Sequence, residues 1–437
     1  MKISYNHSLV SENEITQIGE QLREYIDLLN RVVEGNTYEA YESSINLPSD
    51  TTLTEKSIAA TKEIDISKVR YILDIGIGGS NLGTKAIYDS MYGYFDIIEP
   101  DRYPKMIFLD TVNNEQLQRT IQFLKNKIQS PEEVLIVFIS KSGGTTETIA
   151  NLELLHTYTP HIFDASLKNV VAITDENSPL WNKATEKGIK ALPIPKPVGG
   201  RYSVFSPVGI FPLAALGFNI EALLGGAQDM RSEALSQNYL ENPAIISAAI
   251  QYIQLQKGKT IHDTFIFQSN FESIGKWYRQ LMGESIGKEF DLNNNKVNTG
   301  INPNLSIGST DLHSVGQLYL GGPRDKMTEF VYASKTTEPL TLPGEIFMDG
   351  LVAHIASKTT TNIMDAILQG VMLAYEKKEL PFITVDLEEI SLHSIGEFMQ
   401  FKMIEMMYLG KLLNVNTFDQ PNVESYKIET KKILSEG

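Results

Sequence analysis

Cysteine is absent from the 437 residues of this chain. Without it the chain has no disulfide, no thiolate nucleophile and no zinc site built on sulfur. Positive charge is also scarce, because 38 Lys and Arg face 54 Asp and Glu, giving a net charge of −16. That balance argues against a nucleic-acid-binding surface and against binding to an anionic membrane. If this acidic chain binds a phosphate, it must do so through donors that are concentrated locally.

Long hydrophobic runs are missing as well. The longest uncharged stretch, Tyr202–Ile220, is interrupted by Ser206, Pro212 and Asn219, which suits a buried helix and its approach better than a membrane span. The first residues, from Met1 onward, lack the apolar core of a signal peptide. We therefore expect a cytoplasmic protein that does not cross the membrane.

Histidine is infrequent, and its spacing does not suggest a metal site. The seven histidines include no pair with HExxH or similar spacing. His313 has the most polar, glycine-rich surroundings, because it follows Gly308-Ser309-Thr310-Asp311-Leu312. Four others are typical of ordinary helix or loop positions: His156, His161, His262 and His354. We predict no metal and no cofactor.

The sequence does contain apolar strands that alternate with helical segments. Ser11 and Glu14 have capping-box spacing before a helix that Gly35 is expected to close. Four short apolar runs follow, each separated by helical periodicity: Tyr71–Ile75, Met106–Leu109, Val134–Ile139 and Val170–Ile173. This alternation is typical of a doubly wound parallel sheet.

A second alternating region lies in the C-terminal half. Thr264–Gln268 is predicted as a strand, Phe271–Leu281 as a helix, Val352–Leu373 as an amphipathic helix and the tail as a lysine-rich helix. We therefore expect an α/β fold of two doubly wound parallel-sheet subdomains, each an αβα sandwich, with helical extensions at both ends. The expected division has five parts. They are a helical N-terminal extension 1–65, a first subdomain 66–215, a helical connection 216–258, a second subdomain 259–405 and a C-terminal segment 406–437 that returns to the active site.

The turn Ser140-Lys141-Ser142-Gly143-Gly144-Thr145 follows the buried strand Val134–Ile139 and precedes a helix. A strand, a glycine-rich polar turn and a helix together direct free backbone N–H groups at an anion. Ser140, Ser142 and Thr145 add hydroxyl donors, so a phosphate fits best. The alternative is an ordinary turn with capping hydroxyls. No Gly-Lys-Ser/Thr closes the turn, so it is not the nucleotide P-loop.

Three other segments carry chemistry. Gly76-Ile77-Gly78-Gly79-Ser80 follows the first strand; it approximates a dinucleotide fingerprint but suits a turn against a sugar or phosphate better. In Gly199-Gly200-Arg201, two glycines allow the guanidinium to approach an oxyanion closely, although an exposed turn arginine is the common alternative. Glu284 lies among apolar residues and glycines, where burial would favour a general base; most glutamates are solvated instead.

The ordered set of these motifs closely resembles the phosphoglucose isomerase family of the bacterial type, from about residue 40 to the C-terminus. The matching motifs are Gly76–Ser80, Ser140–Thr145, Val198–Ser203, Gln280 through Glu284-Ser285 to Gly287-Lys288, His313, and Phe418-Asp419-Gln420 with Val423-Glu424 and Lys427. The resemblance implies sugar-isomerase (SIS-like) subdomains and an aldose–ketose isomerase that interconverts glucose 6-phosphate and fructose 6-phosphate through a cis-enediol, in glycolysis and gluconeogenesis.

The resemblance also implies a role for each site residue. Glu284 transfers the proton between C2 and C1, His313 opens the sugar ring with help from Lys427, and Arg201 stabilises the developing oxyanion. The phosphate is held by Ser140, Lys141 (largely through its backbone), Ser142 and Thr145. The sugar is lined by Gly79, Ser80, Gln280 and Gln420. The resemblance further implies a homodimer in which His313 reaches into the partner's active site.

Two other functions compete with this one. The amidotransferring hexosamine-phosphate synthases use the same sugar-phosphate sheet, but they need a cysteine nucleophile that this chain lacks. A sugar-phosphate sensor needs no base, and it would carry a DNA-reading module; no basic recognition helix is present in the sequence. Whether mannose 6-phosphate is also accepted stays open.

Overall fold

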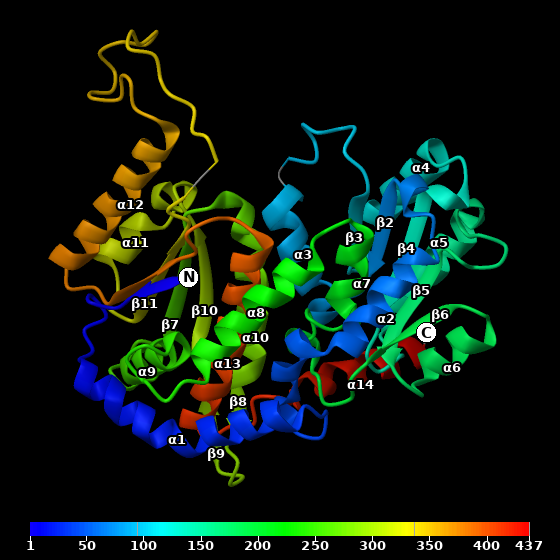
Figure 1. Cartoon of the computed structure of the whole chain (residues 1–437), viewed down its shortest axis with the longest axis horizontal. Coiled ribbons are helices and arrows are strands. Elements are labelled where there is room, and N and C mark those ends of the chain that lie inside the picture. The colour runs from blue at the N-terminus through cyan, green and yellow to red at the C-terminus, as the bar shows by residue number, and fades with distance from the viewer. Residues whose placement is uncertain (94, 336, 437) are drawn as a thin grey trace.

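The computed structural model describes residues 1–93, 95–335 and 337–436 and shows two α/β units side by side (Figure 1). Each unit is built on a five-stranded sheet, and a two-stranded hairpin, β8 Lys288–Phe290 with β9 Lys296–Thr299, is separate from both. The α/β fold with two parallel sheets, predicted from the sequence, is confirmed.

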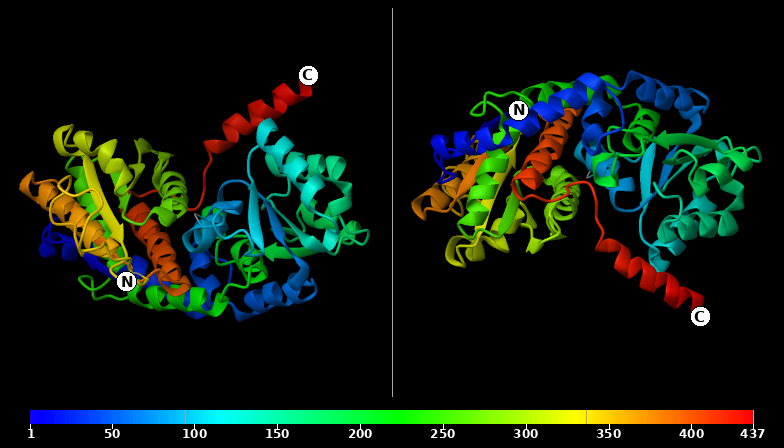
Figure 2. Two further views of the ribbon diagram at one scale, coloured as in Figure 1. Left: turned by 90° about the horizontal axis from the view of Figure 1, so that it is seen from above. Right: turned by 90° about the horizontal axis from the view of Figure 1, so that it is seen from below.

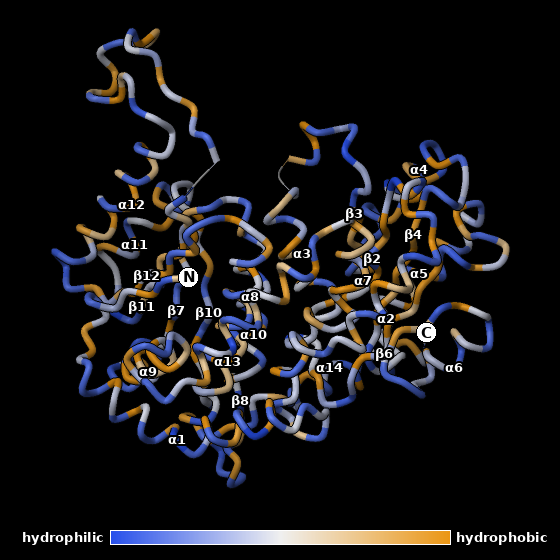
Figure 3. Tube along the Cα trace, in the orientation of Figure 1, coloured by the Kyte–Doolittle hydropathy of each residue, from blue (hydrophilic) through white to orange (hydrophobic). Residues whose placement is uncertain are grey.

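The first sheet has the order β3-β2-β4-β5-β6, and all of its pairings are parallel. Each residue of β4 is buried, as its charge-free sequence requires, and the strands of this sheet are largely hydrophobic in Figure 3. The predicted strands coincide with β2 and β4 at both ends and begin within one residue of β3 and β5. The strands are β2 Tyr71–Ile75, β3 Lys105–Leu109, β4 Val134–Ile139, β5 Val170–Asp175 and β6 Lys190–Ile194.

Helices cover both faces of this sheet. One face packs against α4 Asn114–Lys127, α5 Thr146–Tyr158 and α6 Pro179–Glu186. The opposite face belongs to the large central core, with α2 Thr51–Lys62, α3 Leu82–Tyr88 and α7 Pro207–Ala215. Burial on both faces explains why the strands read as continuous apolar runs.

The second sheet has the order β1-β12-β11-β7-β10. Its parallel strands are β7 Ile261–Ile266, β10 Asn302–Ile307, β11 Lys326–Tyr332 and β12 Phe382–Asp386. α11 Gly316–Gly321 and α12 Thr360–Lys377 pack on its outer face. The central core includes α1 Glu12–Gly35, α8 Ile220–Ala234, α9 Pro243–Gln256, α10 Glu272–Ile286 and α13 Leu392–Leu412.

Several sequence expectations need correction. The N-terminal extension is not purely helical, because β1 Lys2–Ser4 adds an antiparallel edge to β12 before α1, η1 Tyr41–Ser49 and α2. α1 includes Gly35, and Asn36 takes the left-handed position with φ 44°. The helix expected from Val352 begins at Thr360, because Thr359 forms a capping box with Asn362. The buried helix α13 runs through the boundary expected at 405/406.

Two segments project from the body. α14 Val423–Glu436, the predicted lysine-rich helix, extends away from the two units and buries none of its side chains (Figure 2). The arm 337–359 rises above the second sheet before α12 (Figure 1). None of the helices in the described ranges is both long and apolar enough to cross a membrane.

Candidate active site

Two of the predicted loops meet at the point where the strand order of the first sheet reverses. The chain leaves β2 for β3 on one side and later returns to β4 on the other. In open α/β sheets this switch point forms a crevice outside the carboxyl ends of the strands, where ligands bind. Gly76–Ser80 follows β2 and Ser140–Thr145 follows β4, so both line this crevice.

The loop Ser140–Thr145 is a compact turn that leads into α5. The Ser140 and Thr145 hydroxyl oxygens lie 2.8 Å apart, and Thr145 is the N-cap residue of the helix. Gly143 has φ +75°, and a Cβ there would lie 2.7 Å from the Leu180 backbone nitrogen, so glycine is required. A helix N-terminus flanked by hydroxyls is suited to an anion.

The Lys141 ammonium points away from that turn. It donates to the carbonyls of Lys196 and Val198 at 2.6 and 2.8 Å, and burial lowers the pKa of Lys141. The lysine therefore ties the turn to the segment that leads to Arg201. Only the backbone of Lys141 belongs to the turn itself.

The turn after β2 lies directly against the arginine segment. A Cβ added to Gly79 would lie 2.1 Å from the carbonyl carbon of Gly200, and Ser203 donates to the Gly79 carbonyl at 3.3 Å. η3 Gly78–Ser80 and η7 Gly200–Tyr202 are thereby brought into contact. Ser80, the last residue of η3, is half-buried beside them.

We predict that Gly79→Ala destabilises the fold by about 1–3 kcal/mol, because the added methyl group must displace backbone rather than a flexible side chain. It should also lower any activity that depends on Arg201. Chemical denaturation measures the first effect. Gly370→Ala is the matched control, since nothing lies within 4 Å of a Cβ at this exposed helical position. Equal stability of the wild type and Gly79→Ala would contradict the close packing.

Arg201 is the centre of the cluster and is 1 % exposed. Its Nε donates to Ser285 Oγ at 2.9 Å, and its Nη1 donates to Glu284 Oε2 at 3.0 Å and to Gln420 Oε1 at 2.9 Å. Its Nη2 donates to the carbonyls of Thr417 and Asp419. All five N–H donors of a guanidinium are thus engaged, which fixes its plane and position.

Glu284 lies in the last turn of α10. Its Oε1 accepts from Gln280 Nε2 at 2.9 Å, and its Oε2 accepts from Arg201. The strong desolvation expected around Glu284 is not observed, because its side chain is 32 % exposed. Gln280, one turn earlier, also lies over Gly78, which has φ +59°. The helix therefore aims one oriented carboxylate toward the loop after β2.

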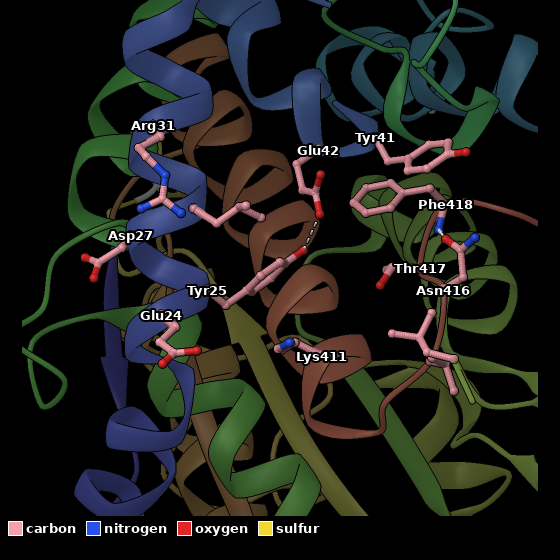
Figure 4. A pocket seen from close by; sticks show the side chains of 13 residues that line it. Glu24, Tyr25, Asp27, Arg31, Tyr41, Glu42, Lys411, Asn416, Thr417 and Phe418 are labelled. Atoms are coloured by element: carbon pink, nitrogen blue, oxygen red, sulfur yellow. Dashed lines mark hydrogen bonds between the residues drawn. The ribbon is translucent and has the colours of Figure 1, made fainter. Parts of the chain in front are cut away.

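The fourth part of the site is the strap Asn416–Gln420, which follows α13. Gln420 and two strap carbonyls face Arg201, as described above. Phe418 stacks on Tyr41, with ring centroids 6.3 Å apart, and lies tilted over Tyr202 at 5.5 Å. A cavity of about 620 Å³ lies on this outer side of the strap (Figure 4). The strap thus forms a wall between that cavity and the Arg201 cluster.

Two predicted catalytic residues are not brought to this cluster within one chain. A Cβ at Gly283 would lie 3.9 Å from the ring of Pro303, so the end of α10 lies beside the start of β10. His313, in η9 Thr310–His313, comes after the opposite end of that strand. The five steps between the first and last residue of this strand, at about 3.3 Å each, separate the two ends by roughly 17 Å. Lys427 lies on the projecting α14, paired with Glu424.

Ser285 and Lys288 belong to the matched motif but received no role in the sequence analysis. Ser285 bridges Arg201 Nε and the Tyr202 hydroxyl, which lies 2.9 Å from Ser285 Oγ. Lys288 contacts Asp419 and is buried. Both residues follow Glu284 closely in the sequence, and this proximity was the one feature from which a place in the site could have been predicted. Thr417 and Asp419 bind Arg201 through their backbone carbonyls, and a motif of side-chain types cannot predict such a contact.

The comparison with known protein families identifies the family of this chain. The family model described as phosphoglucose isomerase matches residues 51–437, which is most of the chain. The chain belongs to the phosphoglucose isomerase family. It is 32% identical to a glucose-6-phosphate isomerase of Carboxydothermus hydrogenoformans, over 84% of this chain and 79% of that protein. It is 31% identical to the glucose-6-phosphate isomerase of Shouchella clausii, over 96% of this chain and 92% of that one.

Two solved structures have a fold similar to that of this chain. A hypothetical protein from Thermus thermophilus superposes with a TM-score of 0.85 at 27% identity, covering 99% of both chains. A glucose-6-phosphate isomerase from Chlamydia trachomatis superposes with a TM-score of 0.82 at 20% identity, covering 99% of this chain and 88% of that one, which shows the fold alone. The resemblance inferred from the motifs is therefore confirmed at the level of family and fold.

Proposed function

We propose that this chain interconverts D-glucose 6-phosphate and D-fructose 6-phosphate, with the Arg201–Glu284 cluster as its active site. It is an isomerase of the phosphoglucose isomerase family, and the curated relatives that it matches are named glucose-6-phosphate isomerase. The observation that carries the assignment of the site is the Glu284 carboxylate, fixed by Arg201 and Gln280 beside the two loops of the switch point. A soluble sugar phosphate as substrate favours the cytoplasm as location.

The phosphate lies in the turn Ser140–Thr145 in this proposal. The hydroxyls of Ser140, Ser142 and Thr145, the backbone of Lys141 and the N-terminus of α5 supply its donors. The sugar extends toward Gly79, Ser80, Gln280 and Gln420. Because the phosphate does not react, its binding energy orients the carbons that do.

The reaction needs a base, a group that stabilises the negative charge of the intermediate, and a group that opens the sugar ring. Glu284 takes the C2 proton of the open-chain aldose, and the negative charge of the enediolate develops on oxygen. The O2 hydroxyl proton passes to O1, and Glu284 returns its proton to C1, so that C2 becomes the ketone and C1 carries the hydroxyl. Arg201 stabilises that charge. All five N–H donors of Arg201 are engaged in the described structure. A substrate oxygen therefore bonds Arg201 by sharing an Nη1 donor with Glu284 or Gln420, or by replacing one of these two side chains. No step in this scheme calls for a metal or a redox cofactor.

Ring opening is assigned to His313 of a second copy, assisted by Lys427, in a homodimer with shared sites. The separation of His313 and Glu284 along β10 supports this arrangement. Exposed apolar side chains on the projecting arm give further support, because patches of this kind mark contact surfaces: Leu340 is 78 %, Phe347 97 %, Leu351 71 % and Val352 61 % exposed. A twofold axis would make both sites equivalent.

Purified protein tests the proposed function directly. With fructose 6-phosphate as substrate, we expect formation of glucose 6-phosphate, detected through a glucose-6-phosphate dehydrogenase that reduces NADP. Dialysis against EDTA should leave the rate unchanged. Binding of fructose 6-phosphate without turnover would favour the sensor function, and loss of activity to EDTA that a divalent ion restores would contradict the metal-independent mechanism.

The phosphate turn is tested by Ser142→Ala combined with Thr145→Ala. We expect fructose 6-phosphate to bind about 1–3 kcal/mol more weakly, because two hydroxyl donors are lost. Isothermal titration measures the affinity, and Thr185→Ala on the exposed surface of α6 serves as control. If wild-type protein bound fructose as tightly as fructose 6-phosphate, the turn would not be the phosphate site.

A further inference from the structure

Lys288 is a buried cation beside the site to which the mechanism above gives no role. It begins β8, directly after Gly287 at the end of α10, and its side chain is 5 % exposed. Its ammonium donates to Asp419 Oδ1 at 2.9 Å and to the Asp419 backbone carbonyl. Burial lowers the pKa of Lys288, and the bonds to Asp419 oppose that shift. A buried ammonium is costly unless it is well paired, so these bonds account for its place.

The Asp419 carbonyl is shared between Lys288 and the catalytic arginine. Arg201 Nη2 donates to the same oxygen at 3.2 Å. The next residue of the strap is Gln420, whose side-chain oxygen accepts from Arg201 Nη1. The Asp419 carbonyl thus connects Lys288 with Arg201, and it directly precedes Gln420, the residue expected to line the sugar. Asp419 Oδ2 is held separately by Asn416 Nδ2 at 2.8 Å.

We infer that Lys288 is a positioning residue for the isomerase reaction. By bonding Asp419, it fixes the position of the strap, so that the side chains of Gln420 and Arg201 are correctly placed to contact the sugar. This inference rests on the proposed function of the Arg201–Glu284 cluster. Lys288 acts through Asp419 and does not touch the substrate itself.

The other attachments of the strap do not replace this contact. Phe418 is held on the far side by stacking on Tyr41, where Figure 4 shows the two rings facing each other beside the cavity. That contact, the Asn416 bond to Asp419 Oδ2 and the Val423 N–H bond to the Gln420 carbonyl at 3.2 Å hold other atoms of this segment and do not bond the Asp419 carbonyl. Among the described residues, Lys288 and Arg201 donate to the Asp419 carbonyl, so removal of Lys288 leaves Arg201 as the remaining donor to that oxygen.

Steady-state kinetics of Lys288→Met test the inference. Methionine keeps most of the volume and the apolar stem but removes the charge and the donors. We expect kcat/KM for fructose 6-phosphate to fall about 10- to 100-fold, since displacement of a catalytic group by about 1 Å has effects of this size. Lys288→Arg should recover part of the loss. Lys296→Met, on the neighbouring strand with its side chain 61 % exposed and paired to Glu289, should leave kcat/KM unchanged.

A double-mutant cycle with Gln420→Ala separates positioning from a loss of stability. If Lys288 acts through the strap, Lys288→Met should cost much less in the Gln420→Ala background than in the wild type, so the two effects should not add. Additive effects, or an unchanged kcat/KM in a folded Lys288→Met protein, would overturn the inference. An inactive wild type would instead refute the proposed function, so the two failures are distinguishable.

Discussion

Glu284→Gln is expected to reduce isomerisation by about 10²–10⁴-fold, which is the usual contribution of a general base. The amide is isosteric and can still accept the bond from Arg201 and contact Gln280, so the arrangement of the cluster should be kept. The loss should therefore appear in kcat. Binding of fructose 6-phosphate, measured by titration, should change little.

The control for this variant is Glu289→Gln, five residues further along the chain. Glu289 makes surface contacts with Lys296 and Asn422, so its amide variant should retain full activity. A Glu284→Gln protein that keeps more than about a tenth of the parental rate would show that another group is the base.

Complementation between two inactive variants is the second large effect. Glu284→Gln and His313→Ala should each be nearly inactive alone. After the two proteins are unfolded and refolded together in equal amounts, activity should rise to roughly a quarter of the wild-type value. Random pairing gives about half heterodimers, and each heterodimer has one intact and one doubly damaged site.

The recovery depends on where His313 acts. If His313 and Glu284 of one chain shared a site, each site in the mixture would carry a lesion and no activity would return. Size-exclusion chromatography with differently tagged chains shows whether heterodimers formed. A mixture that contains them and is still inactive would contradict the shared site.

The sequence predicted the parts of the fold that depend on local pattern. The strand Val134–Ile139 was identified from its charge-free, β-branched residues and is fully buried as expected. The capping box of Ser11 fixed the start of α1. β1 was not identified, because the three residues Lys2–Ser4 become a strand only by pairing with β12, near the other end of the chain. Val352–Thr359 has helical spacing of apolar residues, yet Thr359 caps the helix after them.

The site was predicted in part for the same physical reason. Arg201 and Glu284 carry recognisable side-chain chemistry, whereas Gly79, Gln280 and Gln420 were named through the family resemblance, and the fold gathers all five. Arg201 and Lys288 both bond the carbonyl of Asp419 in the strap. These bonds depend on tertiary contacts between α10, β8 and the segment after α13, which the order of residue types along the chain does not reveal. The roles of His313 and Lys427 stay predictions that depend on the proposed dimer.

Proton exchange with solvent tests the central claim, proton transfer by Glu284, most directly. Fructose 6-phosphate is incubated with the enzyme in D₂O, and the hydrogen at C2 of the glucose 6-phosphate formed is followed by NMR. Wild-type protein should introduce deuterium at C2, because the proton held on the Glu284 carboxylate exchanges with solvent in the enediol stage, and Glu284→Gln should introduce hardly any. Product formed at the wild-type rate with no deuterium would indicate a hydride shift and contradict the account.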